Sequence, residues 1–208
     1  MSTFLRPPGW ASHRARRIFL VKASTAITSP DFSITGLASA GRMDVVARAM
    51  IAALSLRSGV RKDVLFCAVL EGPPKPPVTI ELRGWELERM PLSEAEVGLL
   101  IQKLLRGETV GGAAVRRIGF KEVVLGLLEH LGVSCVVYLH ERGIDVASLE
   151  LGERLAMILG DHKGVDPTTE GWLKSLGVKW VSLGPTPYFT EHCITYMNYL
   201  IDGGVARA

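Results

Sequence analysis

Three hydrophobic runs in the C-terminal part of the chain predict buried strands, and a short polar loop follows each of them. The runs cover Ser134 to Leu139, Leu155 to Leu159 and Val178 to Leu183. The loops that follow are His140-Glu141-Arg142-Gly143, Gly160-Asp161-His162-Lys163-Gly164 and Gly184-Pro185-Thr186-Pro187. Ligands of open α/β sheets bind outside the carboxyl ends of the strands, so this pattern predicts a binding site built by the three loops.

Three further runs in the N-terminal half predict strands of the same sheet. They cover Arg17 to Ala23, Asp63 to Leu70 and Val78 to Leu82. The second run is apolar throughout, as in a central strand, whereas the third alternates and places its apolar residues on one face. Between these two runs, the proline-rich segment Glu71 to Pro77 is expected to be a stiff connector.

Helical signals separate these strands. The segment Met43 to Ser58 is apolar around most of its circumference, which predicts burial on more than one side. Ser93 and Glu96 form a capping-box pattern before a second helix, and Gly132 closes a third helix over Phe120 to Leu131.

The C-terminal part adds two more helices. Asp166 and Pro167 supply the N-cap and the first-turn proline of a fourth helix that Gly177 ends, and a last helix runs from about Glu191 to Ile201. Because strands alternate with helices from residue 115 onward, we predict a three-layer α/β sandwich with a mostly parallel sheet.

Length and charge define the expected domain organisation. The 208 residues are 48% hydrophobic, enough for a packed core, and no linker divides them. Residues 1–30 carry five cations (Arg6, Arg14, Arg16, Arg17 and Lys22) and no acid, so the remainder, with 19 cations and 21 acids, has a net charge of −2. We expect one domain over residues 17–208 after a basic extension over residues 1–16, which either is disordered or contacts phosphates.

Several classes of protein are disfavoured by the sequence. No stretch is long and apolar enough for a membrane span, and no secretory signal follows the N-terminal arginines. Cys67, Cys135 and Cys193 are an odd number in apolar settings, so we expect reduced thiols in a cytoplasmic protein. They are far apart and lack paired ligand spacing, so no metal site is expected.

Six sequence blocks occur in the same order and at similar spacing as in a known protein family. They are Ser39-Ala40-Gly41-Arg42-Met43-Asp44, Arg61-Lys62-Asp63-Val64, Glu71 to Pro77, Val115-Arg116-Arg117-Ile118-Gly119-Phe120, Leu159-Gly160-Asp161-His162 and His192-Cys193-Ile194-Thr195. From residue 18 to about 203 the chain resembles the archaeal tRNA pseudouridine-54 N1-methyltransferases of the SPOUT superfamily.

The resemblance implies a C-terminal deep trefoil knot, a homodimer and S-adenosylmethionine as methyl donor. It implies methylation of N1 of pseudouridine at position 54, in the T-loop of tRNA. Two departures from the family's pattern stand out. The loop Gly184 to Tyr188 lacks a hydroxyl and a carboxylate that are usual there, and Glu191 replaces a smaller polar residue.

Cofactor contacts are carried over from the family position by position. The candidates are Leu139, Gly160, Ser182, Leu183, Gly184, Pro185, Thr186, Pro187 and Cys193. Apolar side chains can face adenine, and glycine lets backbone approach a ligand closely. The alternatives are that Gly160 is an ordinary turn glycine and that Cys193 is a small buried hydrophobic residue.

The proton of N1 needs an acceptor, and Asp63 is the leading candidate because the family uses this position, with Arg61, near the target base. The alternative is a solvated ion pair at the start of a strand. Arg42, Arg116 and Arg117 are the candidates for RNA contacts, although adjacent residues 116 and 117 point to opposite faces of a strand. Asp161 is expected to anchor its loop through backbone hydrogen bonds, and His162 either relays a proton or caps the loop.

The candidate subunit contacts are the helix after Met43 and three residues of the last helix, Ile194, Met197 and Ile201, and the alternative for each is ordinary core. Two other functions remain open: the same methylation on small-subunit ribosomal RNA, and a non-catalytic RNA-binding assembly factor. A nicotinamide-dependent oxidoreductase is disfavoured, because no G-x-G-x-x-G turn follows a strand.

Overall fold

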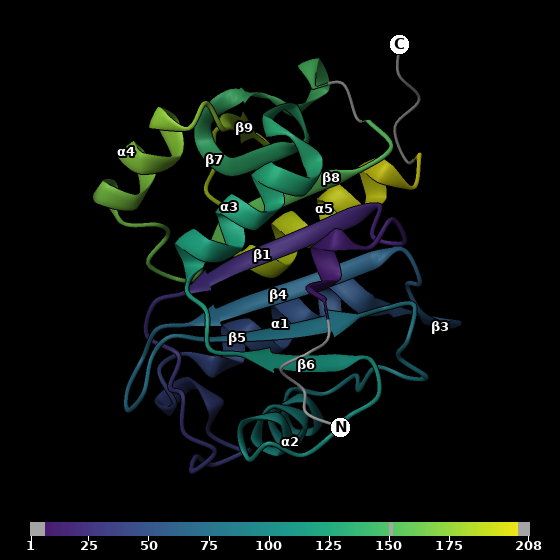
Figure 1. The fold of residues 1–208 in the computed structure, drawn as a ribbon, viewed down its shortest axis with the longest axis vertical. Coiled ribbons are helices and arrows are strands. Elements are labelled where there is room, and N and C mark those ends of the chain that lie inside the picture. The colour runs from purple at the N-terminus through teal and green to yellow at the C-terminus, as the bar shows by residue number, and fades with distance from the viewer. Residues whose placement is uncertain (1–6, 150–151, 204–208) are drawn as a thin grey trace.

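The computed structural model describes residues 7–149 and 152–203 as an α/β fold built on one large sheet (Figure 1). Its strands are β1 (Arg17–Ala23), β4 (Val64–Leu70), β5 (Val78–Arg83), β6 (Ala113–Arg116), β7 (Val136–Asp145), β8 (Leu155–Gly160) and β9 (Lys179–Ser182), with a small hairpin of β2 (Ser55–Leu56) and β3 (Gly59–Val60). The helices are α1 (Met43–Leu54), α2 (Glu94–Leu105), α3 (Phe120–Leu131), α4 (Pro167–Ser175) and α5 (Thr190–Ile201). Short 3-10 turns cover Gly9–Ala11, Leu37–Ser39, Val133–Cys135 and Val146–Ser148.

The seven-stranded sheet has the order β6-β5-β4-β1-β8-β7-β9. Strands β4, β1, β8, β7 and β9 are parallel to one another, whereas β5 is antiparallel to both β4 and β6. The prediction of a mostly parallel sheet is therefore confirmed. Parallel pairing brings the loops that follow β8 and β9 to the same edge of the sheet as the segment around His140 in β7.

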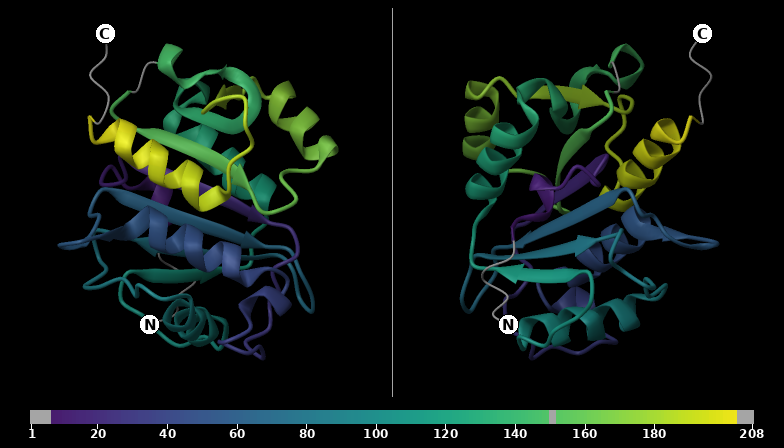
Figure 2. Two further views of the ribbon diagram at one scale, coloured as in Figure 1. Left: turned by 180° about the vertical axis from the view of Figure 1, so that it is seen from behind. Right: turned by 45° about the vertical axis from the view of Figure 1, so that its right-hand side comes forward.

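Helices cover both faces of the sheet, which confirms the three layers (Figure 2). Helices α1, α2 and α5 pack on one face, where alternate strand residues such as Phe19 and Phe66 are fully buried. Helices α3 and α4 pack on the other face, against Ile18, Leu20 and Leu65. Because the central strands are buried on both faces, they form apolar runs without alternation.

Most predicted element boundaries agree with the structure to within two residues. One difference concerns the helix predicted over Met43 to Ser58, since α1 ends at Leu54 and the chain then turns into the β2–β3 hairpin. The predicted burial of this helix on several sides is confirmed, because α1 packs between the sheet, α2 and α5. The capping box of Ser93 and Glu96 is also present, with both side chains hydrogen-bonded to backbone amides.

The predicted loop His140 to Gly143 lies inside β7 instead of after it. The pairing of β7 with β9 shifts between Leu139 and Ile144, so the intervening residues form an irregular bulge. A Cβ on Gly143 would overlap the backbone of Val181, which explains why the chain uses glycine there.

Two residues expected at a subunit contact belong to the core of the chain. Ile194 and Met197 of α5 are fully buried in the cluster that α1 and the sheet share, and Ile201 is partly buried against it. The alternative that Ile194 and Met197 are ordinary core residues is therefore confirmed, because the helix turns this face toward α1. Its opposite face exposes Tyr196 and Tyr199, at 40% and 54%.

Residues 7–16 form a strap that packs against the rest of the described chain. Trp10 is 4% exposed and contacts α3 at Gly126, where a Cβ would overlap the indole nitrogen. The guanidinium of Arg154 donates hydrogen bonds to the carbonyl oxygens of Trp10, Ser12 and Ala15, at 3.1, 2.8 and 2.9 Å. Residues 1–6, including Arg6, lie outside the described part of the chain.

The strap also changes the interpretation of the basic N-terminal region. Arg17 and Lys22 are buried in ion pairs, so they are not available to phosphates. Arg14 and Arg16 are exposed. In the described residues, no helix has the length and apolarity that crossing a bilayer requires.

Candidate active site

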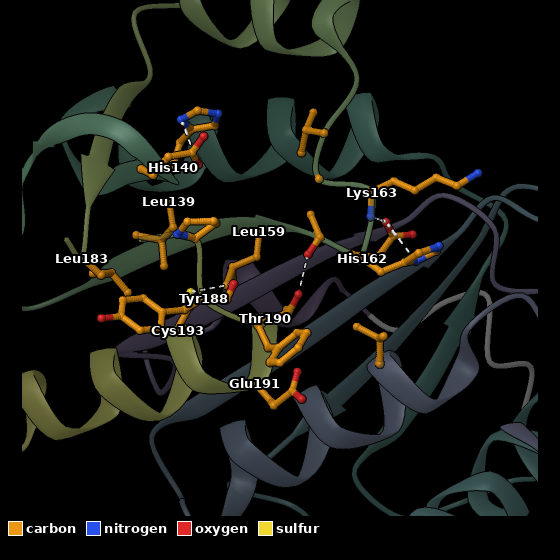
Figure 3. A pocket seen from close by; sticks show the side chains of 18 of the residues that line it. Leu139, His140, Leu159, His162, Lys163, Leu183, Tyr188, Thr190, Glu191 and Cys193 are labelled. Atoms are coloured by element: carbon orange, nitrogen blue, oxygen red, sulfur yellow. Dashed lines mark hydrogen bonds and ion pairs between the residues drawn. The ribbon is translucent and has the colours of Figure 1, made fainter. Parts of the chain in front are cut away.

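A cavity of about 450 Å³ lies at the carboxyl ends of β7, β8 and β9, beside the first turn of α5 (Figure 3). The three segments singled out in the sequence all contribute to it: Leu139 to Glu141, Gly160 to Gly164 and Leu183 to Pro187. The structure thus brings together residues that are up to 48 positions apart in the chain, counted from Leu139 to Pro187. Its volume is in the range of pockets that bind small molecules.

One wall of the cavity is apolar. Leu139, Leu159, Leu183 and Cys193 gather there, with the ring of Tyr188 in front of them (Figure 3). Burial raises the pKa of the Cys193 thiol to about 11, so the side chain is a neutral thiol near pH 7. Cys193 is therefore suited to apolar contact and not to nucleophilic chemistry.

The loop after β8 is anchored by Asp161, as predicted. Its carboxylate accepts hydrogen bonds from the backbone and hydroxyl of Ser24, both at 2.7 Å, and from the backbone of Lys163 at 2.8 Å. A Cβ on Gly160 would overlap the backbone of Gly164. Gly160 is thus required for closing this tight loop, which is the turn-glycine alternative, and its carbonyl also accepts a hydrogen bond from Thr190 at 2.7 Å.

The loop after β9 is held by its own residues. The hydroxyl of Ser182 donates to the carbonyl of Gly184 at 2.8 Å and accepts from the Gly184 amide at 3.1 Å. Gly184 has a φ of +134°, a conformation that other residues rarely adopt. Leu183, Gly184, Thr186 and Pro187 line the cavity, whereas Ser182 and Pro185 do not. Ser182 acts on the pocket by shaping the loop.

A polar wall faces the apolar one. The hydroxyl of Tyr138 donates to Glu170 Oε1 at 3.0 Å, and His140 Nε2 lies 3.3 Å from the same oxygen. Burial, and then the hydrogen bond to Glu170, raise the pKa of Tyr138 well above its ordinary value, so the phenol stays protonated. All three side chains line the cavity.

The mouth of the cavity carries a network of charged side chains at the start of α1. Arg42 lines the cavity and donates two hydrogen bonds to Asp44, at 2.9 and 3.0 Å. These bonds, opposed by burial, lower the pKa of Asp44. Arg48 joins Asp44 to Glu191 in the first turn of α5, at 3.0 and 2.8 Å.

Arg42 is also the one non-glycine residue with a positive φ, +64°, in the described residues. Such backbone conformations are costly and concentrate at functional sites. The structure therefore places this predicted RNA-contact residue at the pocket mouth, with its guanidinium fixed by Asp44.

Arg61 and Asp63, the predicted catalytic pair, lie at the opposite edge of the sheet. Asp63 precedes β4 and forms an ion pair with the buried Arg17 at 2.9 Å, while Arg61 pairs with Asp202 at 2.8 Å. In the register of β1 and β8, Arg17 is paired with Leu155, five residues before Gly160, which is about 17 Å along the strand. Neither residue lines the cavity of its own chain.

Arg116 and Arg117 are also remote from the cavity, at the end of the outer strand β6. Arg116 forms an ion pair with the fully buried Glu81, and its side chain is 13% exposed. Arg117 donates to the carbonyl of Lys75 at 2.7 Å. Arg116 thus has a structural partner inside the domain, which disfavours it as an RNA contact.

Sequence reasoning missed several residues that the structure brings to the cavity. The sequence pattern gives Tyr138 and Glu170 only as positions in a strand and a helix, and it does not single out Arg48. Asp44 belongs to the motif Ser39 to Asp44, so its position two residues after Arg42 was the available signal. Glu170 had no signal of its own, because its role depends on how α4 packs beside β7.

Comparisons with known proteins agree with this geometry. Residues 16–205 match the family model described as "Putative SAM-dependent RNA methyltransferase". Two similar curated proteins are the tRNA (pseudouridine(54)-N(1))-methyltransferases of Methanocella arvoryzae and Methanocaldococcus jannaschii, at 39% and 35% identity. The alignments cover 89% of this chain in both cases, and 98% and 96% of the two relatives.

The fold is also similar to a solved structure. The crystal structure of Archaeoglobus fulgidus Nep1 bound to S-adenosylhomocysteine superposes with a TM-score of 0.61 at 16% identity, covering 91% of this chain and 99% of that chain. Because the family model spans nearly the whole described chain, this protein belongs to the family of S-adenosylmethionine-dependent RNA methyltransferases.

Proposed function

We propose that this protein transfers a methyl group from S-adenosylmethionine to N1 of pseudouridine at position 54, in the T-loop of tRNA. The observation that carries the proposal is the cavity with one apolar and one polar wall at the carboxyl ends of β7, β8 and β9. The relatives named for this reaction align over nearly their whole length, which supports the choice of substrate. A tRNA substrate also fits the cytoplasmic location expected from the sequence.

The residues of the cavity fit the donor. The apolar wall of Leu139, Leu159, Leu183 and Cys193 offers a surface for a flat heterocycle, and the carboxylate of Glu170 offers acceptors for hydroxyl or ammonium groups. The loops around Gly160 and Gly184 are held by hydrogen bonds within the chain, so the site is largely preformed.

The donor supplies a methyl group already activated by the positive charge of its sulfonium. In the reaction, N1 of the base forms a bond to the methyl carbon, the carbon–sulfur bond breaks, and the N1 proton passes to an acceptor. The chain's task is therefore to hold the base in line with the donor and to accept that proton. Arg42, fixed at the pocket mouth by Asp44, is placed to bind a phosphate or the target base.

We further propose that the protein acts as a homodimer through α5. The side chains of Tyr188, Phe189, Tyr196 and Tyr199 are 54%, 67%, 40% and 54% exposed. Phe189, Tyr196 and Tyr199 are spaced seven and three residues apart, so they share one face of the helix. Exposed aromatic residues gathered on one face are typical of protein interfaces.

A dimer would also explain the position of Arg61 and Asp63. In one chain they lie at the edge of the sheet remote from the cavity, so they can serve catalysis only beside the partner's cavity. Mixing two inactive variants tests this arrangement. Asp63→Asn removes the acceptor, and Leu183→Arg blocks the donor pocket.

If the site combines two subunits, each mixed dimer contains one intact site and one inactive site. Half of the dimers in an equimolar mixture are mixed, so the mixture regains about a quarter of the wild-type activity. If Asp63 serves the pocket of its own chain, or only stabilises Arg17, mixing restores nothing. Activity is measured below the melting temperature of Asp63→Asn, because loss of the Arg17 ion pair lowers that temperature in either case.

The trefoil knot is part of the proposal. In the C-terminal part, the chain runs from β7 to the more central strand β8 and then to the edge strand β9. Helix α5 follows and packs on α1. The similarity to the Nep1 fold supports the proposal that this path forms a knot. Stretching the unfolded chain from both ends would reveal a knot as an extension shorter than that of an unknotted chain of this length.

The central experiment is mass spectrometry of tRNA after incubation with protein and S-adenosylmethionine. One methyl group should be gained at position 54 when this nucleotide is pseudouridine. A transcript with uridine at this position is the matched control, because its ring nitrogen at position 1 already carries the sugar. Preferential methylation of a ribosomal RNA fragment, or RNA binding without donor binding, would instead favour one of the two other functions.

A further inference from the structure

We propose that Glu170 binds the ribose hydroxyl groups of the methyl donor, and that Tyr138 and His140 hold its carboxylate in place for this purpose. The inference rests on the proposed function of the cavity as the donor site. It assigns a recognition role to three side chains of the polar wall, all of which line the cavity.

The carboxylate is held from one side. Tyr138 and His140 both approach Glu170 Oε1, at 3.0 and 3.3 Å. The rings of Tyr138 and His140 are themselves fixed by Trp180, at centroid distances of 5.2 and 4.8 Å. The side chains of His140 and Glu170 are only 10% and 14% exposed, so little freedom remains.

The hydrogen bonds also determine the tautomer of His140. The backbone amide of Arg142 donates to Nδ1 of the imidazole at 3.0 Å, so this nitrogen carries no proton in the neutral ring. Nε2 then carries the proton, and it lies 3.3 Å from Glu170 Oε1 and 3.5 Å from Nη2 of Arg142. Tyr138 is thus the hydrogen-bond donor to Glu170 Oε1, and the ring of His140 packs beside the same oxygen.

The second oxygen of Glu170 is left for a ligand. Among the described residues, its nearest charged neighbour is Arg142, whose Nη2 lies 3.9 Å away and whose side chain is 71% exposed. This distance is too long for a hydrogen bond. A carboxylate whose orientation is fixed through one oxygen can accept hydrogen bonds from a ligand at its other oxygen. The first oxygen keeps a free lone pair as well, so the carboxylate can accept from two neighbouring hydroxyl groups.

Its position favours the ribose over other parts of the donor. Leu139 of the apolar wall lies between Tyr138 and His140 in β7, so a ring packed on Leu139 places the sugar attached to it next to the polar wall. Carboxylates recognise ribose hydroxyls in other nucleotide sites for the same reason, since they only accept hydrogen bonds.

The test compares ligands that differ only in the hydroxyl groups. Binding of adenosine and 2′,3′-dideoxyadenosine is measured by competition against S-adenosylhomocysteine, with calorimetry for the latter. Wild-type protein should bind adenosine about tenfold more tightly, or better, because a charge-assisted hydrogen bond is lost in the dideoxy compound. Equal affinity for the two nucleosides would overturn the inference without any variant.

The variant Glu170→Gln keeps the size of the side chain and removes its charge. It should lose about tenfold in affinity for S-adenosylhomocysteine and adenosine, and nothing for dideoxyadenosine. Glu129→Gln is the matched control, because Glu129 is exposed on α3 and does not line the cavity.

An equal loss for all three ligands in Glu170→Gln would contradict the ribose assignment. Failure of the wild-type protein to bind S-adenosylhomocysteine would overturn the donor site itself. The two failures are distinguishable, because in the first one the wild-type protein still binds S-adenosylhomocysteine.

Discussion

Cys193 shows how the environment of a single residue decides its role. A cysteine beside a methyl-transfer site could be a nucleophile, but burial raises the pKa of this thiol to about 11. At pH 7 the thiolate is therefore a minute fraction of the total. The side chain instead completes the apolar wall formed with Leu139 and Leu183.

Replacing Cys193 with alanine should therefore leave the chemical step intact. We expect kcat for methyl transfer to change by no more than about twofold, while KM for the donor rises a few-fold because apolar contact area is lost. Steady-state kinetics with varied donor measures both parameters. Cys135→Ala, remote from the cavity, is the control, and a collapse of kcat in Cys193→Ala would show that the thiol takes part in the reaction.

At the scale of elements, helix α4 connects the fold to the cavity. Its N-cap Asp166 accepts hydrogen bonds from the backbone and hydroxyl of Thr169, at 2.9 and 2.7 Å, and pairs with Lys22 of β1 at 3.3 Å. The next residue of the helix, Glu170, lines the cavity. A cap that orders this turn therefore also orders the polar wall.

Substituting Asp166 with alanine should lower the free energy of unfolding by about 1 kcal/mol at pH 7, the usual effect of losing an N-cap. Although burial would raise it, hydrogen bonds from Thr169 and then Lys22 lower the pKa of Asp166 to about 2. Because the folded pKa lies below that of the unfolded chain, near 3.8, the stabilisation is complete above about pH 4. Urea unfolding should show the difference between wild type and variant shrinking as the pH falls from 4 toward 2.

Ser93→Ala is the matched control for this prediction. Ser93 caps α2 in the same way, but α2 does not contribute to the cavity. Both variants should lose similar stability, and only Asp166→Ala should also weaken donor binding. Equal donor affinity in the two variants would mean that the first turn of α4 does not position Glu170.

The strands and helices were predictable because their patterns are local. The end of α1 was not, since the helical pattern runs past Leu54 into residues that form the β2–β3 hairpin. The meeting of the C-terminal loops followed from the rule that parallel strands end at one edge. The same rule places Asp63, which precedes β4, at the opposite edge, and this consequence was not drawn from the sequence.

Contacts between distant residues were beyond sequence reasoning. Tyr138 and Glu170 are 32 positions apart, and they meet only because α4 packs on the face of the sheet beside β7 and β8. The N-terminal strap is a similar case. A short run of mixed residues before a strand reads as a tail, and only the buried position of Trp10 shows that it belongs to the domain.

At the scale of the whole molecule, this strap closes one face of the sheet. Trp10 lies in the core cluster of α3, β1 and β4, and the strap is also tied to the buried Glu81, which accepts from the Gly9 amide at 3.2 Å. Trp10→Ala should lower the free energy of unfolding by about 3 kcal/mol or more, because a large buried side chain is removed. Urea unfolding measures this loss, and Leu92→Ala, at a residue that is 69% exposed, should change little. A small effect of Trp10→Ala would show that the strap is not part of the cooperative unit.

The proposed homodimer is tested at the exposed face of α5. Tyr196 and Tyr199 face outward from the helix whose other side packs on α1, so a charge introduced there disturbs the surface without entering the core. Tyr199→Glu should therefore convert a particle near twice 22.6 kDa into one of 22.6 kDa in light scattering at micromolar concentration. If the site combines two subunits, tRNA methylation should fall with the dimer fraction while donor binding persists.

Leu125→Glu, at a residue 49% exposed on α3 across the sheet, should keep both the dimer and the activity. An active monomeric Tyr199→Glu variant would show instead that one chain holds a complete site, and Asp63 would then have only its structural role beside Arg17.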